Sequence, residues 1–252
     1  MKLIRVSGLT KTFDGVPAVR GVDFTVAPGE IVGFLGRNGA GKTTTMRMLT
    51  TLLPPTSGTA VIAGRDLLAD PDGVRRTIGY VAQGGATDPT RPVGEELEFQ
   101  AMLYGMRAAE ARRRAAVVLA ALGLAGLEDR PVGALSGGQR RRLDIALGLV
   151  HGPRLLFLDE PTTGLDPQSR AELWTCIRAL RDERDVTVFL TTHYLEEADA
   201  LCDRLLIIDD GRIVADGTPG ELRRRAAGPA APTPTLEEAF LALTGRPIGE
   251  GR

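Results

Sequence analysis

Cysteine is scarce in this sequence. The chain of 252 residues has two, Cys176 and Cys202, which lie far apart in segments with helical spacing. Neither has a second cysteine at CxxC spacing or a cluster of histidines nearby, so the sequence offers no disulfide scaffold and no structural zinc site. We therefore expect the fold to depend on an ordinary hydrophobic core and to suit a reducing, cytoplasmic compartment.

A long hydrophobic run is also absent. The longest uncharged apolar stretch covers residues 115–127 and is flanked by charged residues. It is too short to cross a bilayer, which takes about 20 apolar residues. Residues 1–10 lack the apolar core of a signal peptide. If the protein works at a membrane, we expect it to act from outside the lipid.

An excess of charge of one sign is missing as well. The formal net charge is −1, and acidic residues elsewhere balance the short basic runs at 112–114, 140–142 and 223–225. This is not the charge pattern of a nucleic-acid-binding protein, so no nucleic acid partner is expected. Each basic run is predicted to be a solvated face of a helix rather than a binding patch.

The most informative segment that is present is residues 36–44, GRNGAGKTT, which fits the pattern G-x-x-x-x-G-K-[ST]. An apolar strand-like run (31–35) precedes it and a helix-like run (43–53) follows, as a phosphate-binding loop requires, which disfavours an ordinary glycine-rich turn. Glycines let backbone N–H groups approach an anion closely, and the lysine adds a positive charge. The predicted nucleotide-phosphate site comprises Gly36, Asn38, Gly39, Ala40, Gly41, Lys42, Thr43 and Thr44, with Thr43 placed to bind Mg²⁺.

Strand-like and helix-like segments alternate along most of the chain. Residues 2–9 and 19–26 are predicted to form an antiparallel pair, with Phe13 in the turn region between them. A loop over 84–92, which includes Gly85, is followed by helical spacing that predicts an inserted α-helical subdomain. The fold class is therefore α/β: a P-loop core with a mostly parallel sheet, an N-terminal antiparallel β-subdomain and an inserted helical subdomain.

Two carboxylates follow the apolar run 155–158. The carboxyl ends of parallel strands share one edge of a sheet, so functional side chains should gather there. Asp159 is positioned to hold Mg²⁺ opposite Thr43, and Glu160 to orient or deprotonate the water that attacks a γ-phosphate. His193, at another strand end, is a candidate hydrogen-bond partner of that phosphate, although a lone histidine after a strand is usually structural. The alternative is a solvated acidic strand end.

Six motifs occur in an order that resembles the ATPases of ABC (ATP-binding cassette) transporters. LSGGQ between a helical insertion and an acidic strand end is highly specific for that family. The resemblance covers about residues 2–220 and implies an ATPase domain over 1–225, with its helical insertion at about 84–150, and a linker and tail with a short helix over 226–252. The motifs are the phosphate loop at 36–43, Gln83, LSGGQ at 135–139, LLFLDE at 155–160, GLD at 164–166 and His193.

The resemblance also implies roles for single residues, with ATP and Mg²⁺ as ligands. Phe13 matches the aromatic residue that stacks on adenine, and Asp166 matches the loop that crosses the seam of a homodimer. Gln83 matches the residue that senses Mg²⁺ and water and joins the core to the helical subdomain. Glu160, His193 and Gln83 are thus the implied catalytic residues, and Thr43, Gln83 and Asp159 the implied metal-binding residues. The implied contacts to ATP held by a second copy of the chain are Ser136, Gly137, Gly138 and Gln139.

The C-terminal segment indicates which group of ABC transporter ATPases the chain resembles. A linker rich in proline and alanine (226–234) precedes TLEEAFLAL (235–243), whose apolar residues have helical spacing. The segment resembles the C-terminal part of ATPases from bacterial drug and antibiotic exporters of the daunorubicin-resistance type. The alternative is a short helix that packs on the core. One departure is that residues 95–97 read Glu-Glu-Leu where exporters often have Glu-Asn-Leu.

The resemblance implies the ATP-hydrolysing subunit of an exporter for a drug, antibiotic or lipid-like molecule. We expect a homodimer, joined by ATP, on the cytoplasmic face of the membrane and attached through a separate permease. The alternative is a non-transport ABC ATPase that acts on DNA or the ribosome. Such proteins usually have two cassettes in one chain or a long coiled-coil insertion, and this sequence shows neither. A nucleotide-gated regulatory module without turnover is opposed by the presence of both Asp159 and Glu160.

Overall fold

A computed structural model of the chain describes residues 2–84, 87–227 and 234–248. Gly85 of the predicted loop, residues 228–233 of the predicted linker and the end of the tail lie outside the described residues. The strands are β1 (Ile4–Phe13), β2 (Val16–Val26), β3 (Ile31–Leu35), β4 (Ser57–Ile62), β5 (Arg65–Asp66), β6 (Ile78–Val81), β7 (Leu155–Asp159), β8 (Thr187–Thr192), β9 (Arg204–Asp209) and β10 (Arg212–Gly217). The helices are α1 (Lys42–Leu49), α2 (Pro71–Thr77), α3 (Val93–Leu103), α4 (Ala108–Ala121), the 3₁₀ turn η1 (Val132–Ala134), α5 (Gly137–Leu149), α6 (Pro167–Arg184), α7 (Leu195–Leu201), α8 (Pro219–Ala226) and α9 (Leu236–Thr244).

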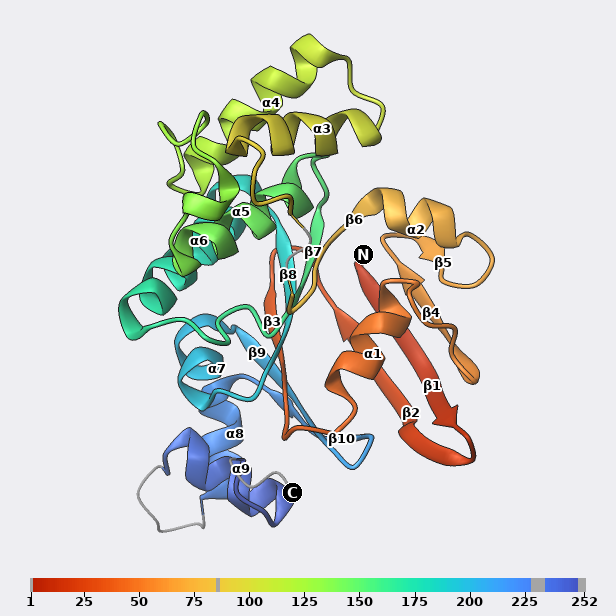
Figure 1. The fold of residues 1–252 in the computed structure, drawn as a ribbon. Helices are drawn as coiled ribbons and strands as arrows, with labels where there is room; N and C mark the ends of the chain where they lie inside the picture. The colour runs from red at the N-terminus through yellow and green to blue at the C-terminus, as the bar shows by residue number, and fades with distance from the viewer. Residues whose placement is uncertain (1, 85–86, 228–233, 249–252) are drawn as a thin grey trace.

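The strands form two sheets (Figure 1). The larger has the order β10-β9-β3-β8-β7-β6 and is parallel except for β10, which pairs antiparallel with β9. The smaller is antiparallel, with the order β2-β1-β4-β5. This arrangement confirms the predicted α/β class, with a mostly parallel main sheet and an antiparallel sheet built largely from the N-terminal residues.

The three central strands of the larger sheet are continuous apolar or near-apolar runs. All residues of β3 (IVGFL), β7 (LLFLD) and β8 (TVFLTT) are buried, as expected for parallel strands that are covered on both faces. Successive side chains point to opposite faces, so Ile31 and Leu35 join one core cluster and Val32 and Phe34 the other. Helices α3 to α6 pack in the first cluster, and the N-terminal sheet packs with α1 in the second.

The helical insertion and the tail lie at opposite ends of the molecule. Figure 1 shows α3 and α4 at the top, and α8 and α9 at the bottom. The inner face of α9 buries Leu236, Ala239 and Phe240 in contact with α7, α8 and β10. Of the two readings of the tail, the structure therefore supports packing of the short helix on the core.

Two local expectations need correction. Phe13 is not in a turn but is the last residue of β1, paired with Val16, because Asp14 and Gly15 both adopt positive φ (46° and 81°) and close a two-residue hairpin. Helix α2 was not expected from the sequence. It begins after Asp70, whose carboxylate accepts a hydrogen bond from the Gly73 N–H at 2.9 Å, so an Asp-Pro start signal was present in the sequence.

Candidate functional site

The loop between β3 and α1 has the conformation that a phosphate-binding loop needs. Gly41, with φ of 106°, precedes the first turn of α1. A Cβ atom at Gly36 would lie 2.4 Å from the Ile208 carbonyl oxygen, and one at Gly41 would lie 2.7 Å from the Ala18 carbonyl oxygen. Both positions therefore require glycine. The first N–H groups of α1 have no partner within the helix and remain available to an anion.

A cavity of about 370 Å³ opens beside this loop. It brings the phosphate loop together with Gln83 and Glu160, which come from the ends of two other strands. All of its lining residues except Ala18, on β2, were predicted from the sequence. They are Ala18, Asn38, Gly39, Gly41, Lys42, Thr43, Thr44, Gln83 and Glu160.

Lys42 is held within the loop. Its Nζ donates hydrogen bonds to the carbonyl oxygens of Gly36 (2.8 Å) and Arg37 (3.0 Å), and it lies 3.5 Å from Glu160 Oε1. Burial lowers the pKa of Lys42, while the nearby carboxylates of Glu160 and Asp159 oppose that shift. A buried ammonium group beside a cavity is a favourable partner for an anionic ligand.

Asp159 and Thr43 face each other across the loop. Thr43 Oγ1 donates to Asp159 Oδ1 at 3.3 Å, and Thr191 Oγ1 donates to the same oxygen at 2.5 Å. A hydroxyl and a carboxylate are the oxygen ligands that Mg²⁺ prefers, so these residues fit that ion. Within the described parts of the chain, no three His, Cys, Asp or Glu side chains converge as a metal site. The other ligands of an ion here would therefore come from Gln83, water or the phosphates of a nucleotide.

Glu160 is the centre of a polar network. Its Oε2 accepts hydrogen bonds from Gln83 Nε2 (3.2 Å) and Thr163 Oγ1 (3.3 Å), and its Oε1 lies 3.1 Å from His193 Nδ1. The backbone of Glu160 has φ of 45°, a conformation that costs a non-glycine residue about 1–3 kcal/mol and persists only when surrounding contacts fix it. The structure thus brings together the three residues predicted to be catalytic.

The other predicted site residues lie apart from this cavity. Phe13 is 44% exposed, with Lys11 Nζ 5.2 Å from its ring centre, and is not among the lining residues. Ser136 caps α5 and forms a capping box with Gln139. Asp166 caps α6 and accepts hydrogen bonds from the Ser169 N–H (2.9 Å) and hydroxyl (2.6 Å).

LSGGQ (135–139), the signature sequence, nevertheless shares one surface with Asp166. A Cβ atom at Gly138 would lie 2.8 Å from Ser169 Oγ, so the first turn of α5 packs directly against the first turn of α6. Ser136 and Gly137 remain exposed there. The structure therefore brings most of the predicted residues together in two places: one group lines or adjoins the cavity, and the other forms a separate surface, the signature surface, at the starts of α5 and α6. Phe13 belongs to neither group.

The prediction that residues 140–142 form a solvated helix face is wrong for Arg141. Arg140 and Arg142 are partly exposed, but Arg141 is only 7% exposed and donates to three backbone carbonyls at the strand ends. Helical spacing places it on the buried face with Gly138 and Ile145. That spacing indicates that Arg141 is buried, but the arginines on both sides of it favoured a solvated face.

Thr191 was also missed as a candidate site residue. Its hydroxyl donates to Asp159 Oδ1 and accepts from the Glu160 N–H at 3.0 Å. The sequence showed only that Thr191 lies at the end of an apolar strand. Its role depends on the pairing of β7 with β8, which sets Asp159 opposite Thr191.

Comparisons with known proteins agree with this geometry. The sequence profile of the ABC transporter family matches residues 19–163. The chain is 50% identical over 222 residues to the daunorubicin/doxorubicin resistance ATP-binding protein DrrA of Streptomyces peucetius, an alignment that covers 88% of this chain and 67% of the relative.

Solved structures show the same fold. CbiO1 of Clostridium perfringens, part of the ABC transporter complex cbiONQ, superposes with a TM-score of 0.80 at 30% identity, covering 88% of this chain and 90% of that one. A dimeric post-hydrolysis ATP-binding cassette bound to ADP and Pi gives a TM-score of 0.76 at 26% identity, covering 85% and 98%. From its motifs, its cavity and these similarities, the chain belongs to the ABC transporter family, as a subunit that binds and hydrolyses ATP.

Proposed function

We propose that this chain hydrolyses ATP to drive export of a drug, antibiotic or lipid-like molecule through a separate permease. The similarity to a protein named for daunorubicin and doxorubicin resistance supports export. It also disfavours the alternative of an ABC ATPase that acts on DNA or the ribosome. The observation that carries the proposal is the convergence of Lys42, Gln83 and Glu160 on one cavity beside the phosphate loop.

Within that cavity, the loop N–H groups and Lys42 bind the phosphates of ATP. Glu160 orients the attacking water and accepts its proton, because its carboxylate lies at the cavity wall and is held by a hydrogen bond from Gln83, with His193 Nδ1 3.1 Å away. His193 also hydrogen-bonds the γ-phosphate. Thr43, Asp159 and Gln83 would hold Mg²⁺, which neutralises charge on the phosphates when it is bound.

The adenine of ATP stacks on Phe13 in this proposal. Phe13 ends β1, and the neighbouring strand β2 supplies Ala18 to the cavity, so the β1–β2 hairpin connects the two. The exposed ring offers an apolar face for a base, and stacking does not need the hydroxyl of a tyrosine.

A second copy of the chain completes each ATP site. The residues of the signature sequence lie on a surface apart from the chain's own cavity, and Asp166 lies with them. The capped N-terminus of α5 carries a positive dipole end that suits the γ-phosphate of a nucleotide. The similarity to a dimeric ATP-binding cassette supports a homodimer in which Ser136, Gly137, Gly138, Gln139 and Asp166 of one copy face ATP on the other.

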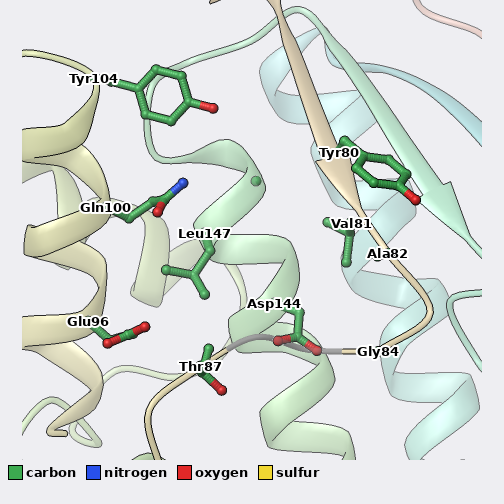
Figure 2. A pocket seen from close by; sticks show the side chains of 11 residues that line it. Tyr80, Val81, Ala82, Gly84, Thr87, Glu96, Gln100, Tyr104, Asp144 and Leu147 are labelled. Atoms are coloured by element: carbon green, nitrogen blue, oxygen red, sulfur yellow. The ribbon is translucent and has the colours of Figure 1, made fainter. Parts of the chain in front are cut away.

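None of the helices within the described residues is long and apolar enough to cross a bilayer. In the proposed function, the chain lies on the cytoplasmic face of the membrane and is held there by the permease, as the similarity to exporter ATP-binding proteins suggests. The docking site is a pocket of about 250 Å³ between α3, α5 and β6. Figure 2 shows Glu96 and Gln100 extending from α3 toward α5, which carries Asp144 and Leu147.

The chemistry of this pocket favours a cationic side chain from a short permease helix. Glu96 and Asp144 are acidic, and the described lining residues include no basic one, although Arg91 (3.0 Å) and Arg141 (3.7 Å) reach these carboxylates from outside the lining. Nearby on α3, Phe99, Met102 and Leu103 expose apolar surface that suits the body of such a helix. The pocket adjoins Gly84, one residue after Gln83, so docking there connects the permease to the ATP site.

The test of the proposal separates ATP binding from hydrolysis. Lys42→Ala should abolish most ATP binding, because Lys42 acts on the phosphates in the ground state. Glu160→Gln should keep ATP affinity and stall hydrolysis, because the carboxylate acts on the way to the transition state. Gel filtration of the Glu160→Gln protein should show a dimer with ATP and a monomer without it.

Glu183→Gln on the exposed surface of α6 is the matched control and should behave as wild type. Turnover by Glu160→Gln at the wild-type rate would contradict the role of Glu160. A Glu160→Gln protein that binds ATP and stays monomeric would contradict the ATP-joined dimer.

A further inference from the structure

The guanidinium group of Arg141 connects helix α5 to the ends of two strands. Its Nε donates to the Pro161 carbonyl oxygen (2.8 Å), its Nη1 to that of Ala82 (2.8 Å), and its Nη2 to that of Asp159 (3.1 Å). All three nitrogens of the side chain are therefore used, each on a different backbone carbonyl. The planar fork of arginine is the one side chain that can do this with a single rigid group.

The three carbonyls have positions in the chain that matter for the ATP site. Asp159 and Pro161 are the residues on either side of Glu160, and Ala82 directly precedes Gln83. Strands β6 and β7 are neighbours, with Val81 paired to Leu158, so one guanidinium group reaches both strand ends. Arg141 thus holds the backbone beside Glu160, which is proposed to act on the attacking water, and beside Gln83, which donates a hydrogen bond to the Glu160 carboxylate.

This contact is made by a charged group that is almost completely buried. Arg141 is 7% exposed, and its closest carboxylate oxygen, Asp144 Oδ2, is 3.7 Å away. The three carbonyls therefore supply its short directed hydrogen bonds, with the Asp144 carboxylate nearby, and charge-assisted hydrogen bonds of this kind are stronger than neutral ones. Because both carbonyls that flank Glu160 are held, its backbone stays at φ of 45° and its carboxylate reaches Lys42, Gln83 and His193.

We propose that Arg141 is a positioning residue that sets Glu160 and Gln83 relative to α5, so that the placement of the catalytic carboxylate depends on the helix that LSGGQ begins. Arg141 lies two residues after Gln139, in the part of α5 that the capping box starts. A shift of α5 when the signature sequence meets ATP on a second copy is then transmitted through one guanidinium group to the chain's own Glu160. This inference rests on the roles of Glu160 and of the signature sequence in the proposed function.

Arg141→Lys tests the inference because it keeps the charge and removes the fork. One ammonium group cannot reproduce three directed contacts at these positions, so kcat should fall about tenfold to a hundredfold, in line with a small misplacement of a catalytic group. ATP affinity should stay within about threefold, because the phosphate loop is untouched. The matched control is Arg142→Lys, the next residue on α5, whose side chain pairs with Glu172 instead; its kcat should stay within about twofold of wild type.

A double variant distinguishes positioning from general damage to α5. If Arg141 acts through Glu160, adding Arg141→Lys to Glu160→Gln should not lower the slow residual hydrolysis any further, and ATP should still induce the dimer. The inference is overturned by wild-type kcat in folded Arg141→Lys, by an equal loss of turnover in the Glu160→Gln background, or by loss of the dimer there.

Thermal unfolding checks that each variant is folded, and Arg141→Gln replaces the lysine variant if that one is not. Failure of both to fold would also overturn the inference in favour of a purely structural role. The proposed function fails separately: wild-type turnover in Glu160→Gln removes the role of Glu160, whatever Arg141 does.

Discussion

Glu160 and Thr191 form a pair on which the geometry of the site depends. Glu160 has a positive φ directly after the buried strand β7, where the chain turns away from the sheet. Its N–H donates to both the side-chain oxygen (3.0 Å) and the carbonyl oxygen (3.2 Å) of Thr191. Thr191 thereby fixes the backbone from the side opposite to the carbonyls that Arg141 holds.

Thr191→Val should separate this role from packing, because valine has nearly the same shape and no hydroxyl. Asp159 Oδ1 would lose a donor, and the Glu160 N–H would lose an acceptor. Each group keeps one longer hydrogen bond, from the Thr43 hydroxyl and to the Thr191 carbonyl oxygen respectively. The main loss is the short hydrogen bond to a charged carboxylate, a kind of bond that contributes about 1.5–3 kcal/mol. We expect that decrease in the free energy of unfolding, measured with denaturant, and about a tenfold decrease in ATP turnover.

Thr191→Ser is the control, since serine keeps the hydroxyl, and it should retain most of the turnover. A valine variant with wild-type stability and turnover would show that the two hydrogen bonds of the Thr191 hydroxyl have no role in the site.

The site residues that could be predicted from the sequence are those that lie in a short sequence motif. Lys42 lies in the loop motif and Glu160 follows an apolar strand, so neither needed knowledge of the tertiary structure. Thr191 and Arg141 were missed because their partners come from strands far away in the chain. The spacing of Arg141 relative to Gly138 and Ile145 was visible, but it predicts only burial and says nothing of the carbonyls that Arg141 meets.

The sequence predicts that helix α9 exists, but it does not predict what the helix packs against. The capping box of Thr235 and Glu238 starts the helix, and Leu236 and Phe240 lie one turn apart on its inner face. The sequence pattern fits a partner surface and a core surface equally well. The choice depends on where α7, α8 and β10 lie, which a local pattern does not contain.

Phe240→Ala should destabilise the chain without affecting the ATP site. Phe240 is fully buried, and truncating a buried phenylalanine to alanine costs about 3–5 kcal/mol. Helix α9 packs away from the phosphate loop, so ATP affinity of the folded protein should be unchanged. Denaturant unfolding and nucleotide titration measure the two effects.

Leu241→Ala is the matched control on the same helix, because Leu241 is 45% exposed, and its effect should be small. Equal stability of the two variants would mean that α9 does not pack on the core in solution.

The whole molecule presents three functional surfaces in different places. The cavity lies beside α1, the signature surface lies at the starts of α5 and α6, and the proposed permease pocket lies between α3, α5 and β6. Helix α5 contributes to the last two, and Arg141 joins it to the first. In the proposed function, α5 is therefore the element through which ATP, the second copy and the permease are all connected.

Glu96→Lys should weaken assembly with the permease. The substitution replaces a carboxylate that lines the pocket with a cation, which would repel the cationic side chain proposed to enter there. We expect at least fivefold less permease to be recovered when the tagged chain is purified from membranes. ATP binding by the isolated chain should change little.

Glu110→Lys makes the same charge change on the exposed first turn of α4 and should leave assembly intact. Because Glu96 also pairs with Arg91 at 3.0 Å, Glu96→Gln is measured beside it as a milder change. Full recovery of the permease with folded Glu96→Lys would rule out this pocket as the docking site.

The strand order of the main sheet has a consequence for the synthesis of the protein. The phosphate loop departs from β3, whose two neighbours come late in the chain: Ile31 pairs with Val188, and Val32 with Arg204. At a translation rate of about 5–20 residues per second, β3 waits about 8–30 seconds for β8. During that time the N–H and C=O groups along its edges have no strand to pair with and its apolar side chains are uncovered, which exposes the nascent chain to aggregation. Because Gly36 packs against the Ile208 carbonyl of β9, we expect the phosphate loop to fold, and ATP to bind, only after β9 has been made.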